Sequence, residues 1–202
     1  MNMKNFLFLT LIVLYVPVFA GTGAIGIGDK ATLTDIKMLD VSGEEVSLAD
    51  ATKENGLLVL FSSNTCPFVL QWESRYNEIK DWADRHKVGM IVLNSNYGNR
   101  DGVDSYDAMK KQASEKNYNF YYAVDKDSKI ANAYGGQVTP HAFLFNSDMM
   151  LVYKGALDDN YKSAKDVRQA YLKDAIQNVA SGKEVAIAET KPLGCSIKRK
   201  LD

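Results

Sequence analysis

The chain has 202 residues, with 24 lysines and arginines against 25 aspartates and glutamates, and 46% of its residues are hydrophobic. A formal net charge of −1 argues against nucleic acid or an acidic membrane surface as a partner, because a near-neutral protein attracts neither. Two cysteines are too few for a disulfide scaffold, so a hydrophobic core must hold this fold together.

The first 20 residues have the pattern of a secretory signal peptide. Lys4 precedes an apolar region from Phe6 to Val16, and the predicted cleavage site follows Ala20. About 11 to 14 apolar residues are too few to span a membrane, and no cysteine follows them to carry a lipid anchor. We therefore predict an exported protein, periplasmic or secreted, that keeps no membrane contact after cleavage and has a net charge of −2.

The next elements predict a hairpin, a buried strand and a long helix. Short extended segments at 36–40 and 45–48 flank the turn Ser42-Gly43, which is typical of a small hairpin. The continuous apolar run Leu57–Phe61 indicates a strand that is buried on both faces. A helix is predicted from Pro67 to about His86, because apolar residues recur there at steps of three and four. Its apolar face comprises Val69, Trp72, Tyr76, Ile79 and Ala83, with Glu73, Arg75, Glu78, Lys80 and Asp81 mostly on the other side.

The second half of the chain alternates strands and helices. We predict strands at 90–93 and 120–124, helices around Tyr106–Ala113 and over 128–134, and a hairpin formed by 141–145 and 150–153. Ser163 is a suitable N-cap for a last helix that extends to about Val179. A parallel βαβ crossover joined to an antiparallel hairpin predicts an α/β fold, with a mixed central sheet and helices on both faces.

Cys66 is the strongest candidate for chemistry. It stands between the strand that ends at Phe61 and the helix that begins at Pro67, a residue favoured at the first helical position. Unpaired backbone N–H groups at a helix N-terminus stabilise a thiolate over a thiol. A thiolate there can attack a peroxide oxygen or a disulfide sulfur, and the oxidised product then needs a second thiol to resolve it.

Four segments, taken in order along the chain, resemble segments of thioredoxin-fold proteins. The resemblance is to the peroxiredoxin-like redoxin group, which is of the AhpC/TSA type and is related to thiol-disulfide oxidoreductases. They are Cys66-Pro67-Phe68-Val69, Thr139-Pro140-His141-Ala142-Phe143, Gly155–Asp159 and Gly194-Cys195-Ser196-Ile197-Lys198. The resemblance implies a thioredoxin-like fold with an N-terminal hairpin extension. It also implies a cis peptide bond before Pro140, facing the cysteine. We expect the redoxin domain to cover 21–182, and 183–202 to form an irregular tail.

The sequence departs from both parent patterns. Thioredoxins carry a second cysteine three residues after the first, where this chain has Val69. Peroxiredoxins carry a proline where this chain has Val59, and a threonine hydroxyl that Ser63 can replace. Cys195 is therefore the only internal candidate for a resolving thiol, and the tail that carries it is expected to move.

The site predicted from these residues has Cys66 as nucleophile and Cys195 as resolving thiol, with Thr65 and Ser63 donating hydrogen bonds to the thiolate. We expect a further group to bind the substrate: Pro67, Phe68, Thr139, Pro140 and His141. The substrate is a peroxide or a disulfide, and a thiol protein is the reducing partner. The two cysteines and two histidines lack the close pairs of a metal site, and no cofactor is expected.

Simpler structural interpretations of these residues stay open. Cys66 and Cys195 can form a permanent disulfide that staples the tail of a non-catalytic binding module, and closing so long a loop would stabilise the fold by about 4 to 5 kcal/mol. Both thiols can instead be inert. His141 can be ordinary strand packing, and His86, at a helix end, is explained by contact with the helix dipole.

Overall fold

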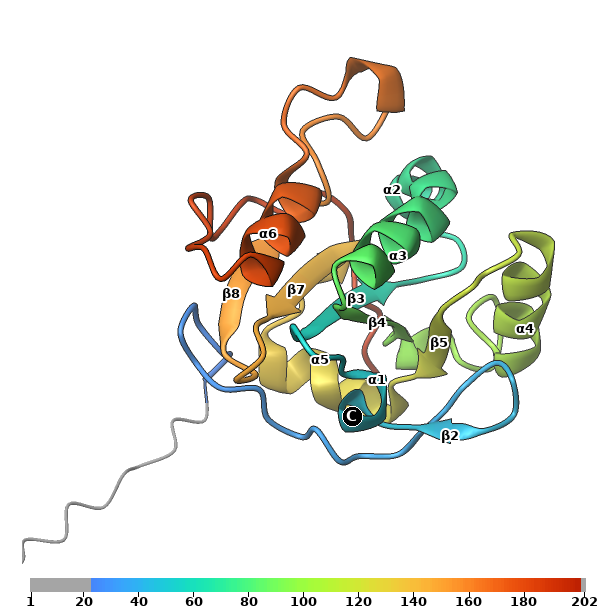
Figure 1. Ribbon diagram of the computed structural model, residues 1–202. Coiled ribbons are helices and arrows are strands. Elements are labelled where there is room, and N and C mark those ends of the chain that lie inside the picture. Colours follow the sequence, from blue (N-terminus) through green and yellow to red (C-terminus); the bar gives the residue numbers. More distant parts are fainter. Residues whose placement is uncertain (1–22, 201–202) are drawn as a thin grey trace, which may run out of the picture.

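A computed structural model describes residues 23–200, so the predicted signal peptide lies outside the described residues. The centre of the fold is a mixed five-stranded sheet in the order β5-β4-β3-β7-β8 (Figure 1). Its strands are β3 (Leu57–Ser62), β4 (Gly89–Asn94), β5 (Tyr121–Val124), β7 (His141–Phe145) and β8 (Leu151–Gly155). The first three are parallel, and β7 pairs antiparallel with both β3 and β8. The predicted α/β class with a mixed sheet is confirmed.

Helices cover both faces of this sheet (Figure 1). The α-helices are α1 (Leu48–Ala51), α2 (Pro67–Trp72), α3 (Tyr76–Arg85), α4 (Tyr106–Glu115), α5 (Lys129–Tyr134) and α6 (Tyr171–Ala180). Short 3₁₀ turns are η1 (Glu73–Arg75), η2 (Tyr97–Asn99), η3 (Lys126–Ser128) and η4 (Ala164–Asp166). Two further pairs of short strands lie outside the sheet: β1 (Met38–Leu39) with β2 (Glu45–Val46), which is the predicted hairpin, and β6 (Val138–Thr139) with β9 (Cys195–Ser196).

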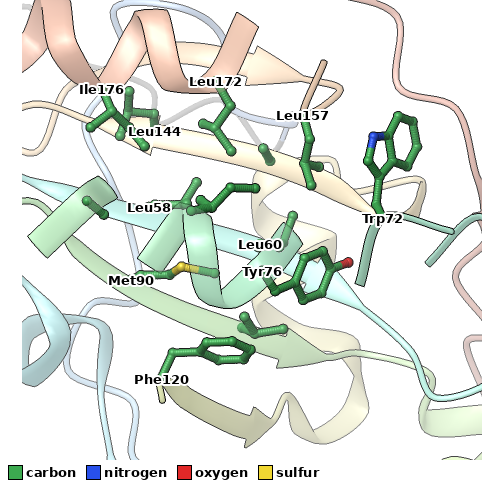
Figure 2. Packing of buried hydrophobic residues seen from close by; sticks show 14 of the residues in the cluster. Leu58, Leu60, Trp72, Tyr76, Met90, Phe120, Leu144, Leu157, Leu172 and Ile176 are labelled. Carbon is green, nitrogen blue, oxygen red and sulfur yellow. The ribbon is translucent and has the colours of Figure 1, made fainter. Parts of the chain in front are cut away.

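The continuous apolar strands supply two cores, because successive side chains point to opposite faces of a sheet. Leu58 and Leu60 of β3 pack toward α2, α3 and α6, in a cluster with Trp72 and Tyr76 (Figure 2). Their neighbours Val59 and Phe61 join the cluster under α1 and α5. All of these β3 side chains are fully buried, so Cys66 follows a strand that is fixed from both sides.

The helix predicted from Pro67 to His86 is interrupted. The 3₁₀ turn η1 separates α2 from α3, and two of its residues expected on the exposed side, Glu73 and Arg75, are buried. Both make polar contacts inward. Glu73 accepts a hydrogen bond from Tyr118 Oη at 2.5 Å and another from Gln112, while Arg75 pairs with Asp158. Apolar periodicity does not report such contacts, because the buried partners are polar.

The last helix begins later than predicted. Ser163 precedes only the 3₁₀ turn η4, and α6 begins at Tyr171 after Ala170, without a side-chain cap. The intervening loop, drawn in orange, projects beyond the body of the molecule near α2 (Figure 1). Asn160 accepts two backbone hydrogen bonds in this loop, from Lys162 and Ser163, and Ser163 is therefore part of a turn rather than of the helix.

The C-terminal segment is irregular for most of its length but is tied to the fold. Lys154 of the edge strand β8 donates a backbone hydrogen bond to Ala188 and accepts one from Thr190. Further on, Cys195 and Ser196 form β9. In the described range 23–200, no helix has both the length and the apolar character needed to cross a membrane.

Candidate active site

The Cys66 thiol lies where the predicted strand-to-helix junction placed it. Cys66 is the N-cap of α2, with φ −64° and ψ 122°, and Pro67 follows as the first helical residue. The cysteine is 5% exposed and packs at the end of the core cluster that contains Leu60 and Trp72. A thiol so placed is shielded from water but borders the surface that carries Pro67, which is exposed.

The segment before Pro140 faces this thiol. The Thr139–Pro140 peptide bond is cis, as the resemblance implied. Thr139 is fully buried, and in the thiol form Cys66 Sγ donates a hydrogen bond to its backbone oxygen at 3.0 Å. The structure therefore brings Cys66 into contact with Thr139, the residue before the cis bond to Pro140, although the two are 73 positions apart in the chain.

Ser63 and Thr65 differ from what was predicted. Ser63 is buried, and its Oγ accepts hydrogen bonds from the backbone N–H of Cys66 and from Thr139 Oγ1, both at 3.3 Å. Ser63 thus contacts the Cys66 backbone and the Thr139 hydroxyl rather than the sulfur itself. Thr65 is exposed, and its hydroxyl forms no hydrogen bond to Cys66. The expectation that it stabilises the thiolate is not supported by this arrangement.

Cys195 lies beside Cys66. Strand β9 pairs antiparallel with β6, in a register that sets Cys195 opposite Thr139, the residue whose oxygen contacts Cys66 Sγ. Both thiols are free, and Cys195 is partly exposed at the rim of the same core cluster. The sequence offered no signal for this pairing beyond the second cysteine itself, because a two-residue strand has no readable periodicity.

The two thiols titrate differently. Burial raises the pKa of Cys66, but hydrogen bonds from Cys195, the Val69 backbone N–H and Thr139 outweigh it, and the pKa is lowered from its ordinary value. Burial raises the pKa of Cys195, and the hydrogen bond to Cys66 and its charge raise it further, to about 11. Of the two thiols, Cys66 is therefore the one whose surroundings favour the thiolate, while the raised pKa of Cys195 favours its protonated form.

An aromatic surface adjoins the thiols. Phe68, partly exposed in the first turn of α2, lies 5.1 Å from Tyr161, measured between ring centroids. Tyr161 belongs to the loop between β8 and α6. Asp158 fixes that loop by accepting hydrogen bonds from Trp72 Nε1 at 2.9 Å and from Arg75 at 2.5 Å. Sequence reasoning missed Arg75, Asp158 and Tyr161, and Asp158 was interpreted only as part of a polar turn.

His141 is not a neighbour of the thiols. It is 6% exposed and packs against Phe143, with 4.5 Å between ring centroids. Phe143 belongs to the core cluster under α5, whereas Cys66 belongs to the opposite one. Burial lowers the pKa of His141 to about 4. The His141 side chain therefore packs within the strand layer, which is the structural alternative given above. The expectation that it binds substrate has no support in this arrangement.

No cationic side chain of the described residues hydrogen-bonds Cys66 Sγ, although the charge of Lys198 acts on the neighbouring Cys195. The buried Arg75 is engaged by Asp158. Within residues 23–200, no cluster of three or more His, Cys, Asp or Glu side chains is suited to a metal ion. A cavity of about 790 Å³ lies elsewhere, between Asp40 and Tyr121, and neither cysteine lines it.

Comparisons with known proteins agree with this geometry. Residues 27–154 match the model of the AhpC/TSA family. A hypothetical protein from Sinorhizobium meliloti 1021 is similar in structure, with a TM-score of 0.79, 30% sequence identity, and coverage of 89% of this chain and 97% of that one. An uncharacterized conserved protein from Geobacillus kaustophilus has a TM-score of 0.81 and 28% identity, and the match covers 88% of this chain and 94% of that one.

A more distant likeness concerns the fold alone. A putative thiol:disulfide interchange protein DsbE from Chlorobium tepidum has a TM-score of 0.56 and 19% identity, and the match covers 79% of this chain and 98% of that one. Comparison with curated proteins finds no match. On the family match, the thioredoxin-like fold and the thiol placed before α2, the chain belongs to the AhpC/TSA family of thiol-dependent oxidoreductases.

Proposed function

We propose that the protein is an exported thiol-disulfide oxidoreductase in which Cys66 and Cys195 form a reversible redox couple. The observation that carries this proposal is the pairing of β9 with β6, which sets Cys195 opposite Thr139 while Cys66 Sγ contacts the Thr139 oxygen. Export rests on the signal pattern of residues 1–20.

The reaction has two exchange steps. The Cys66 thiolate attacks one sulfur of a substrate disulfide, a mixed disulfide forms, and the other substrate sulfur leaves as a thiolate that takes a proton from water. The Cys195 thiolate then attacks Cys66 Sγ and releases the first substrate sulfur. The substrate disulfide is reduced by two electrons, and the Cys66–Cys195 dithiol becomes a disulfide. A thiol protein that attacks this disulfide returns the enzyme to its reduced form.

The charges of the two thiols favour this order. While Cys66 is a thiolate, it raises the pKa of Cys195, which stays protonated and donates a hydrogen bond. Once Cys66 is bound in a mixed disulfide its charge is gone, and Cys195 loses that cause of its raised pKa. Cys195 therefore becomes a better nucleophile at the moment when its attack is needed.

Peroxide reduction is the second candidate, and the AhpC/TSA family match is the observation that favours it. In that reaction the Cys66 thiolate attacks a peroxide oxygen, an alcohol or water leaves, and Cys195 converts the sulfenic acid to the same disulfide with loss of water. Disulfide exchange is preferred because no lysine or arginine of the described residues hydrogen-bonds Cys66 Sγ, and Val59 occupies the proline position of peroxiredoxins.

The test is intact mass with thiol alkylation on mature protein. Reduced protein is treated with one equivalent of a small disulfide or of hydrogen peroxide, and the initial rates are compared. Fast loss of two hydrogens, reversed by a mild reductant and absent in Cys195→Ser, is the expected result, and the faster oxidant identifies the reaction. A bond that is present from purification and resists mild reductant would establish the permanent staple. Two thiols that stay free would contradict the redox couple altogether.

A further inference from the structure

The edge of β6 is occupied by the protein's own tail. Val138 pairs with Ser196 and Thr139 with Cys195, and Ile197 extends the contact by donating a backbone hydrogen bond to Gln137 at 3.0 Å. An unoccupied strand edge recruits extended polypeptide through its backbone groups. Because β9 takes this edge beside Cys66, the tail occupies the position from which an extended partner would reach the nucleophile.

The tail fits this edge in a sequence-dependent way. A Cβ atom on Gly194 would lie 2.2 Å from the oxygen of Thr139 and 2.6 Å from its carbonyl carbon, so no larger residue can precede the cysteine in this position. Two residues after the cysteine, the Ile197 side chain enters the core cluster under α5 and is 5% exposed. The edge therefore selects glycine, then cysteine, then any residue, then an apolar residue.

The tail is also separable from the rest of the fold. Lys191–Leu193 form no backbone hydrogen bonds within the described residues, so the chain before Gly194 is an unpaired connection. Beyond Ile197 the attachment is polar. Lys198 bonds to Asn96 Oδ1 and to the Gly98 N–H, and the Arg199 guanidinium donates to the Gly136 oxygen at 2.6 Å. For the tail to leave β6, these few bonds open and Ile197 withdraws from its cluster, a local opening that a chain end undergoes while the rest of the core stays folded.

We propose that β6 is a shared seat, held by the tail in the resting protein and by an extended client polypeptide during the reaction. The tail sequence Gly194-Cys195-Ser196-Ile197 then has the same pattern as the client segment that it replaces. The preferred client is a protein disulfide in which one cysteine directly follows a glycine and stands two residues before an apolar residue. This inference rests on the proposed function, of which it specifies the substrate class.

The shared seat explains how a buried thiol reaches a protein substrate. When the tail leaves, the client strand pairs with β6 and its cysteine takes the place of Cys195, beside Cys66. The Cys66 thiolate attacks that sulfur, and the client's second sulfur leaves as a thiolate. The returning tail displaces the client strand and delivers Cys195 to Cys66 Sγ, and the client cysteine leaves as the second thiolate. Each thiolate takes a proton from water.

The first test uses peptides that copy residues 192–199, with the cysteine activated as a mixed disulfide with thionitrobenzoate. Mature Cys195→Ser protein attacks the peptide sulfur and releases the coloured thiolate, so the rate follows absorbance. A peptide with alanine in place of the glycine should react more slowly by about tenfold or more, because the added methyl group meets the Thr139 backbone. Equal rates for the two peptides would overturn the shared seat.

The second test moves the same substitution into the protein. Gly194→Ala in the Cys195→Ser background should unseat the tail and speed the reaction of Cys66 with the glycine peptide. Gly102→Ala is the matched control, since a Cβ there meets only the Asn99 oxygen at an ordinary 3.8 Å. Circular dichroism and the melting temperature establish that both variants are folded. A reaction that is not faster than in the control contradicts tail displacement.

The outcomes distinguish a failure of the shared seat from a failure of the proposed redox function. If the protein with both cysteines forms its reversible disulfide while the two peptides react equally, only the shared seat fails. If no reversible disulfide forms, the proposed function fails, whatever the peptides do.

Discussion

At the scale of single residues, the lowered pKa of Cys66 has its main cause in a residue 129 positions away in the chain. Burial alone would raise the pKa of the Cys66 thiol, and the hydrogen bond from Cys195 is the largest contribution that lowers it. Removing the Cys195 thiol should therefore raise the pKa of Cys66. The measurement is the pH dependence of thiolate absorbance or of alkylation rate in Cys195→Ser, compared with the reduced protein.

The control for this prediction is Ser196→Ala, which changes the next residue of β9 but leaves the thiol pair intact. An unchanged pKa for Cys66 in Cys195→Ser would show that the two sulfurs do not interact in solution. The pairing of β9 with β6 would then lack the functional meaning assigned to it.

His141 predicts a pH dependence of stability. Burial lowers its pKa to about 4, and Nδ1 has no hydrogen-bond partner. Between about pH 6.5 and pH 4 the unfolded chain binds a proton that the folded protein does not, so the stabilising effect is complete above pH 6.5 and is lost as pH falls. The free energy of unfolding should decrease by up to about 1.4 kcal/mol per pH unit across this window.

Urea unfolding at pH 7 and pH 5 measures this effect. His141→Gln should flatten the pH dependence, whatever its effect on stability at pH 7. His86→Gln, which changes the only other histidine, should retain it. A profile of His141→Gln that stays as steep as that of the unaltered protein would assign the proton to another group.

At the scale of elements, the turn η1 is fixed by a buried ion pair. The side chains of Arg75 and Asp158 are 8% and 9% exposed, with 2.5 Å between Nη1 and Oδ2. Asp158→Ala should destabilise the protein by about 3 to 5 kcal/mol, because it leaves a buried guanidinium without its counter-ion. Glu54→Gln, which removes an exposed pair with Lys87, should cost less than about 1 kcal/mol.

Urea unfolding of the two single variants measures this difference. Replacing both partners by apolar residues, as Arg75→Met with Asp158→Leu, should restore most of the loss, because no charge is then left unpaired. A loss in Asp158→Ala no larger than in Glu54→Gln would mean that the guanidinium reaches water by another route.

The same elements show what the sequence could predict. The strands predicted at 57–61 and 90–93 correspond to β3 and β4, and the predicted hairpin to β7 and β8, because continuous apolar runs and turn residues indicate buried strands locally. The interruption at η1 and the late start of α6 were missed. The first depends on the buried pair of Arg75 with Asp158, two residues far apart in the chain. The second depends on the partly exposed turn that Asn160 forms within its own loop, which has no periodic pattern.

At the scale of the whole molecule, the sequence indicated which residues belong to the site but not how the fold brings them together. The position of Cys66 before a helix is a local feature, and the resemblance supplied the cis bond before Pro140. The meeting of Cys66 and Cys195 depends on a two-residue ladder between β6 and β9, and no pattern within either segment encodes that contact.

The oxidation state of the couple should change the stability of the whole chain. In the chain-entropy model, closing the loop from residue 66 to residue 195 stabilises the fold by at most about 5 kcal/mol. The fold stabilises the bond by the same amount that the bond stabilises the fold, because the two effects share one thermodynamic cycle. If the disulfide gained the full amount, its reduction potential would be about 100 mV lower in the folded protein than in the unfolded chain. A potential lowered that far suits a permanent structural disulfide rather than a reversible redox couple.

We therefore expect oxidised protein to be more stable than reduced protein, but by clearly less than about 5 kcal/mol. Urea unfolding of the two forms at equal pH measures the difference. Cys195→Ser, treated with the same oxidant under conditions that exclude mixed disulfides, should show none. A gain close to the full chain-entropy value, with a bond that mild reductant does not open, would identify a permanent staple between Cys66 and Cys195. A small gain with a readily opened bond is what alternating occupation of β6 requires, because the tail must leave that edge in each cycle.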